Sequence, residues 1–131
     1  MASSDLPLVV VLNSNKVLEY RRDRALTERQ TRDLENTEIK MQSGIQVGNE
    51  FIDDPSEQDK AIFMANQLVS ALENNHDPII AISCAYLATS YPDLLQVRAV
   101  LENGSYSIQL INDEIYVENT PLKFKSKKDL Y

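Results

Sequence analysis

Cys84 and His76 are the chain's single cysteine and single histidine, and together they could supply a nucleophile and its base. We predict that a helix begins between them, near Asp77. At about 1.5 Å per helical residue, their Cα atoms would lie about 12 Å apart, which is beyond hydrogen-bond reach. Cys84 also falls in the most apolar stretch of the chain, where burial makes a thiol inert. We therefore expect a core residue at 84 and a loop residue at 76.

A cluster of acidic side chains could coordinate a hard cation. It consists of Glu50, Asp53, Asp54, Glu57 and Asp59. A calcium loop needs acids at alternate positions around a central glycine, whereas this cluster is interrupted by Pro55 and Ser56. The spacing of Asp54, Pro55 and Glu57 instead predicts a helix start, with Asp54 as the capping residue and Pro55 in the first helical position. We expect no metal and no other cofactor.

The sequence contains no complete motif of the common catalytic classes. The chain has three glycines, and the segment from Gly44 to Gly48 lacks the Lys-Ser/Thr pair that follows in a phosphate-binding loop. No serine lies in a Gly-x-Ser-x-Gly elbow, and one histidine is too few for most acid–base triads. The sequence therefore indicates no catalytic residue and favours a function that is not enzymatic.

Arginines are concentrated near the N-terminus and are the candidate partner-binding residues. Five of the six are Arg21, Arg22, Arg24, Arg29 and Arg32. Guanidinium groups suit carboxylate or phosphate partners, although the interleaved acids are also typical of a solvated surface. The net charge of −7 repels nucleic acid, so an acidic protein surface is the favoured partner. The acidic segment of a second copy offers such a surface, which predicts a homodimer.

The composition and the apolar stretches indicate the cellular compartment to expect. One cysteine excludes an internal disulfide and a cysteine-based zinc site. The stretch 79–91 is uncharged but has only 13 residues, against the roughly 20 that a bilayer span needs. The apolar run Leu6–Leu12 has no basic residue before it, unlike a secretory signal. We expect a cytoplasmic protein that does not enter membranes.

In the first half of the chain, the pattern predicts a strand over 6–12 and a turn over 13–15. Residues 16–24 fit either a second hairpin arm or a helix start, and we favour the hairpin for 16–20. Thr27 and Gln30 have capping-box spacing, so we predict a helix over 27–42. Its thin apolar stripe indicates a helix that is exposed or available to a partner. Residues 44–48 read as a turn-rich link.

The second half predicts two helices and then strands. An amphipathic helix should run from Asp54 to about Asn74, and an apolar helix should follow the Asp77–Pro78 start over 79–89. Together they form a helical hairpin. Pro92 ends the second helix, and the period then changes to that of strands. With Asn103-Gly104 as a hairpin turn, we predict a three-strand meander over 95–102, 105–111 and 114–118.

These elements predict an α+β fold, in which the helical hairpin packs on a small antiparallel meander beside an N-terminal strand and a charged helix. We expect one domain over 1–122 and a basic, poorly ordered tail over 123–131. The leading functional hypothesis is a non-catalytic interaction or regulatory module that self-associates. The alternative is a small enzyme or ligand- or metal-binding domain with a pocket between sheet and helices, using Tyr86, Tyr106, Tyr116 and acids of 50–59. The third is a weak nucleic-acid binder acting through the arginines.

Overall fold

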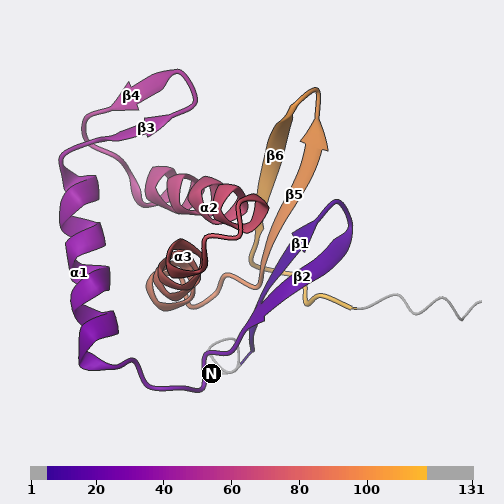
Figure 1. Cartoon of the computed structure of the whole chain (residues 1–131), viewed down its shortest axis with the longest axis horizontal. Coiled ribbons are helices and arrows are strands. Elements are labelled where there is room, and N and C mark those ends of the chain that lie inside the picture. Colours follow the sequence, from indigo (N-terminus) through magenta and orange to yellow (C-terminus); the bar gives the residue numbers. More distant parts are fainter. Residues whose placement is uncertain (1–5, 118–131) are drawn as a thin grey trace, which may run out of the picture.

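The computed structural model describes residues 6–117. Three helices and two sheets make up this part of the chain, as Figure 1 shows. Along the sequence the elements are β1 (Leu8–Leu12), β2 (Asn15–Tyr20), α1 (Glu28–Gln42), β3 (Ile45–Val47), β4 (Glu50–Ile52), α2 (Glu57–Glu73), α3 (Asp77–Ser90), β5 (Gln96–Glu102) and β6 (Ser105–Ile111). The predicted α+β class is confirmed.

The larger sheet has four strands in the order β2-β1-β5-β6. The pairs β1–β2 and β5–β6 are antiparallel hairpins, whereas β1 and β5 run parallel. The predicted hairpins at 13–15 and at Asn103-Gly104 are both present, with positive φ at Asn13, Ser14, Asn103 and Gly104. The sheet is therefore mixed, and β1 is an inner strand rather than an addition beside a meander.

The predicted third meander strand over 114–118 is wrong for the residues described, because 114–117 form no strand. After β6 this segment instead contacts the face of the sheet that lies away from the helices, which we call the outer face. The side-chain amide of Gln96 donates to the carbonyl oxygen of Glu114 at 2.8 Å. That hydrogen bond takes the place of a strand-to-strand ladder.

Helices α2 and α3 form the predicted hairpin and cover the other face of the sheet (Figure 1). Strand side chains that alternate along β1 and β5 point into this layer, among them Leu8, Val10 and Val97. They meet Leu68 of α2 and Leu87 of α3, which are fully buried. Burial of these apolar side chains is the main contribution to stability.

The starts of α2 and α3 differ from the prediction. Ser56, not Asp54, caps α2, and its hydroxyl accepts from the backbone N–H of Asp59 while the Asp59 carboxylate accepts from that of Ser56. This reciprocal pair satisfies two backbone donors at once. The Asp54/Glu57 pair has the same spacing, but the helix begins at Glu57, so the Ser56/Asp59 pair is the one that caps it. Pro55 precedes the cap and is buried. In α3 the cap position is His76, so Asp77 already belongs to the helix.

The segment predicted to be a turn-rich link forms a second small sheet, in which β3 and β4 pair through Ile45 and Ile52. Its reversal at Gly48 has a positive φ. Gly44, at the entry to β3, has a φ of 116° and lies directly under the ring of Phe51. Strands of three residues are too short to show the alternation of apolar and polar residues, so the sequence did not predict this hairpin.

A polar cluster joins α1 to the helical hairpin. Lys60 of α2 lies 2.6 Å from one oxygen of Glu38 on α1, and the hydroxyl of Tyr86 on α3 donates to the other oxygen at 2.5 Å. The Lys60 side chain is only 9% exposed, and its charge is compensated by this carboxylate and by that of Glu57, at 3.4 Å. The cluster therefore sets the position of α1 on α3.

Within residues 6–117, no helix has the length and apolar character needed to cross a membrane. The predicted domain boundary at 122 and the predicted basic tail over 123–131 lie outside the described residues.

Candidate functional site

Arg22 differs from the other candidate arginines because it is half-buried and holds the fold together. Its guanidinium donates to the carbonyl oxygens of Leu6, Ala88, Tyr91 and Leu94, at 2.9, 3.3, 3.2 and 2.6 Å respectively. Two of these carbonyls belong to the end of α3, where helix carbonyls lack partners and attract cations. Burial lowers the pKa of this guanidinium from its ordinary value. Arg22 is therefore unsuited to partner binding.

The other four arginines are exposed. Arg21, Arg24, Arg29 and Arg32 lie on the segment before α1 and on the first turns of α1, and we call them the arginine surface. Arg21 pairs with Asp23 at 2.6 Å, an exposed contact that raises the pKa of Arg21. Within the part of the chain that the structure describes, the remaining three form no ion pair. Their charges are available to a partner.

The acidic segment lies beyond the opposite end of α1, around β4 (Figure 1). Glu50, Asp53, Asp54 and Glu57 are exposed there, while Asp59 is occupied as part of the α2 cap. Helix α1 has 15 residues, so at about 1.5 Å per residue its ends are about 22 Å apart. Basic and acidic surfaces on one copy are thus too far apart to contact each other along α1.

Exposed apolar side chains accompany these charges. Ile39, 61% exposed, follows Arg32 by seven residues, a spacing that puts both on the side of α1 away from Leu34 and Met41. Phe51 of β4 is 57% exposed. Exposed large apolar groups beside exposed charges are typical of protein interfaces, whose cores are apolar and whose rims are polar.

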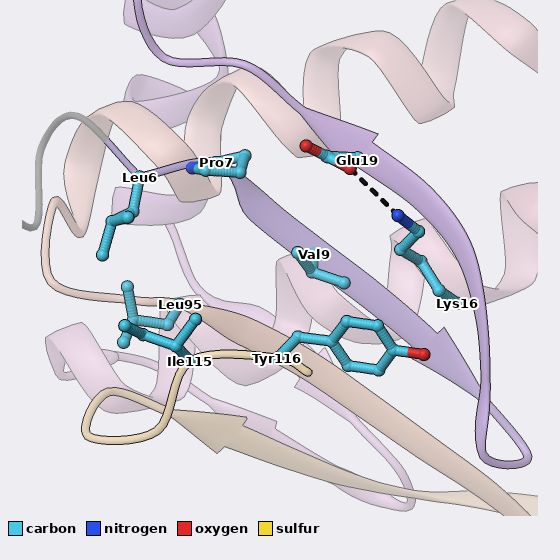
Figure 2. A pocket seen from close by; sticks show the side chains of 8 residues that line it. All are labelled: Leu6, Pro7, Val9, Lys16, Glu19, Leu95, Ile115 and Tyr116. Atoms are coloured by element: carbon cyan, nitrogen blue, oxygen red, sulfur yellow. Dashed lines mark hydrogen bonds and ion pairs between the residues drawn. The ribbon is translucent and has the colours of Figure 1, made fainter. Parts of the chain in front are cut away.

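A second candidate site lies on the outer face of the four-stranded sheet, where residues 114–117 contact it. An apolar hollow of about 250 Å³ is lined by Leu6, Pro7, Val9, Leu95 and Ile115, together with Lys16, Glu19 and Tyr116. In Figure 2 the ion pair between Lys16 and Glu19 borders one side of this hollow, and Leu95 and Ile115 border the other. The Lys16 ammonium also lies 6.0 Å from the centre of the Tyr116 ring.

A polar hollow of about 530 Å³ adjoins the first and shares Lys16, Ile115 and Tyr116 with it. Arg98 and Gln96 of β5 contribute its central polar groups, and Glu114 also lines it. Sequence reasoning missed both β5 residues. The available signal was their alternation with Val97 and Ala99, which places two polar side chains together on one face of an inner strand.

Residues considered for catalysis do not come together. Tyr86 is buried in the helical layer, Tyr116 contacts the outer face, and Tyr106 lies near the β5–β6 turn. Cys84 is buried in α3, where desolvation raises the pKa of its thiol to about 12, and His76 is exposed at the start of that helix. Among residues 6–117, no three His, Cys, Asp or Glu side chains are arranged to hold a metal ion.

Comparisons of the chain with protein-family models, with curated proteins and with solved structures find no match.

Proposed function

We propose that this protein is a non-catalytic interaction module that self-associates as a homodimer, in which the arginine surface of each copy contacts the acidic segment of the other. The observation that carries this proposal is the placement of the two surfaces at opposite ends of α1 (Figure 1). A two-fold axis across α1 would bring each basic end against an acidic end. Both contacts would then form at once, as symmetric dimers require.

The charges and the apolar side chains have different roles in this interface. An exposed ion pair contributes only about 0.2–1 kcal/mol, so charge pairing sets orientation and association rate more than affinity. Ile39 and Phe51 supply apolar surface, and burying such a side chain fully contributes about 1.5–3 kcal/mol. The dimer should therefore be weak and should dissociate further as salt screens the charges.

Hydrogen bonds from Arg22 to backbone carbonyl oxygens hold the segment that carries Arg21 and Arg24 in place, which favours a defined interface. Cys84 is a free thiol, which agrees with the reducing conditions of the cytoplasm, the location that we propose.

Size-exclusion chromatography with light scattering tests the proposal at low salt. The wild type should show a mass that rises with concentration toward that of two chains, and Asp53→Lys/Asp54→Lys should stay monomeric. A matched control, Glu102→Lys/Asp113→Lys, makes the same change of charge beside the four-stranded sheet and should associate like the wild type. A wild type that remains monomeric, or a dimer unaffected by the Asp53/Asp54 change, would overturn the proposal.

A further inference from the structure

Arg98 is a half-buried cation in the middle of the four-stranded sheet. Its strand, β5, lies between β1 and β6, and Arg98 is paired in register with Val11 on one side and Gln109 on the other. No ion pair joins Arg98 to an acidic side chain among residues 6–117. A half-buried cation that borders a hollow and has no acidic partner among these residues is suited to binding an anionic ligand.

The orientation of this guanidinium is set by its neighbour. Arg98 donates through Nη1 to Oε1 of Gln96 at 2.8 Å, and Nε2 of Gln96 donates to the Glu114 carbonyl oxygen at 2.8 Å. Gln96 is only 1% exposed, so its amide is fixed by packing as well as by these two bonds. A guanidinium has five N–H donors, and Gln96 takes one of them within the described part of the chain. The others can bind an acceptor with two oxygens, which is the geometry that a carboxylate offers.

The adjoining apolar hollow extends the site beyond Arg98. Val9, Leu95 and Ile115 line it, and the Tyr116 ring lines both hollows. The polar hollow, at about 530 Å³, falls within the usual range of about 300–1,000 Å³ for small-molecule sites. A ligand that spans both hollows needs an anionic group at one end and a short apolar group at the other.

We propose that the outer face of the sheet binds a small aliphatic or aromatic carboxylate, with the carboxylate held by Arg98 and the apolar group placed between Val9 and Tyr116. The site is on the face away from the helical hairpin and does not involve the arginine surface. It is therefore independent of the proposed dimer.

Acidic neighbours limit the affinity of this site. Lys16 is engaged with Glu19 at 3.1 Å, so this pair adds little net charge. Glu114 also lines the polar hollow, and its negative charge disfavours an incoming carboxylate. Removing that charge should strengthen binding, whereas removing the Arg98 charge should abolish most of it. Opposite effects from two residues lining the same hollow are a specific signature of an anion site.

The test is a titration of the ¹⁵N-labelled full chain with sodium acetate, propanoate, butyrate and benzoate at constant ionic strength, followed by amide chemical shifts. Saturable shifts should appear in β1, β5 and 114–117. The dissociation constant should fall by about 4-fold for each methylene that enters the apolar hollow. Butylamine hydrochloride, which has a cationic group on a similar chain, should cause no saturable shift. Equal affinity for acetate and butyrate, or binding of butylamine, would overturn the proposal.

Variants separate the site from general surface effects. Arg98→Met should weaken butyrate binding at least 10-fold, and Arg98→Lys should weaken it less because the charge remains without the planar fork. Glu114→Gln should strengthen binding by about 3-fold, an effect that loss of folding cannot produce. Arg24→Met is the matched control and should bind like the wild type. Equal butyrate affinities in Arg98→Met, Glu114→Gln and the wild type would contradict a carboxylate site at Arg98.

Discussion

The guanidinium of Arg22 donates a hydrogen bond of 2.6 Å to the carbonyl oxygen of Leu94, across 72 positions of sequence. The same side chain binds carbonyl oxygens near the end of α3, at Ala88 and Tyr91. It therefore fastens the segment after β2 to the segment between α3 and β5. Because α1 follows this segment, Arg22 fixes where the arginine surface lies.

Replacing Arg22 with methionine should destabilise the fold by about 2–4 kcal/mol, because half-buried carbonyls would lose a charged donor and keep their desolvation cost. Urea unfolding measured by circular dichroism gives this change in free energy. Arg24→Met, which removes the same group from an exposed position nearby, should cost less than about 0.5 kcal/mol. Equal costs for the two variants would contradict the anchoring role.

Glu38→Gln should reduce the free energy of unfolding by about 1–3 kcal/mol near neutral pH, because it leaves the poorly exposed ammonium of Lys60 with only the more distant carboxylate of Glu57, at 3.4 Å. The matched control is Glu35→Gln, an exposed change of the same kind on the same helix. Urea unfolding at pH 7 compares them. A Glu38 variant as stable as the Glu35 variant would show that the cluster does not hold α1.

The difference between wild type and Glu38→Gln should also depend on pH. Hydrogen bonds from Lys60 and Tyr86 hold the pKa of Glu38 below its ordinary 4.5, so this stabilisation is present above 4.5 and is lost as pH falls through the lowered value. The hydrogen bond with Glu38 in turn raises the pKa of Lys60 above its ordinary 10.5. The stabilisation by the charged Lys60 is therefore present below 10.5 and is lost only as pH rises through the raised value. Unfolding at several pH values should show a constant difference from about pH 6 to 9 and a shrinking one in acid.

Cys84 should be unreactive toward a disulfide reagent such as DTNB in the folded protein at pH 8. Burial raises the pKa of its thiol to about 12, which leaves about 1 thiolate in 10⁴ at that pH. Absorbance should then rise at a rate that increases with urea concentration, as unfolding exposes the thiol. Rapid labelling of one thiol without urea would contradict the burial of α3.

Gly44→Ala should destabilise the fold more than Gly48→Ala. Both glycines have positive φ, but a Cβ at Gly44 would collide with the Phe51 ring, whereas one at Gly48 meets nothing within 4 Å. Gly48, at φ 62°, lies in the left-handed region, where alanine costs about 1–2 kcal/mol. Gly44, at φ 116°, lies outside that region, so both its backbone conformation and the collision make its replacement the more costly one. Thermal unfolding compares the variants, and the double variant Gly44→Ala/Phe51→Ala should recover part of the loss. Equal destabilisation by both glycine changes would contradict the close approach of Phe51.

Local patterns predicted the elements whose signals lie within a few residues. Asn103 and Gly104 formed the expected turn, and Thr27 and Gln30 formed the expected cap. The helical hairpin followed from the apolar spacing of α2 and the nearly uniform apolar character of α3. The turn and the cap are stabilised by interactions within a few residues, and the two helices are marked by the spacing of their apolar residues, so each signal can be read from the sequence.

Relationships between distant segments could not be predicted in this way. The parallel pairing of β1 with β5 joins strands separated by most of the chain, and nothing in either strand specifies its partner. Arg22 looked like its exposed neighbours because its partners are backbone carbonyls, which have no sequence signature. Arg98 was overlooked for a related reason, since its role depends on which face of which strand borders a hollow.

The most direct test of the proposed function is a charge-swap experiment by analytical ultracentrifugation at low salt. Arg24→Glu/Arg29→Glu/Arg32→Glu and Asp53→Lys/Asp54→Lys should each sediment as monomers alone, because each loses one half of every contact. Mixed together they should form a heterodimer. At one contact the new glutamates face the new lysines, and at the other an unchanged arginine surface faces an unchanged acidic segment. Two variants that stay monomeric in the mixture, or a triple-arginine variant that still dimerises alone, would contradict self-association through these surfaces.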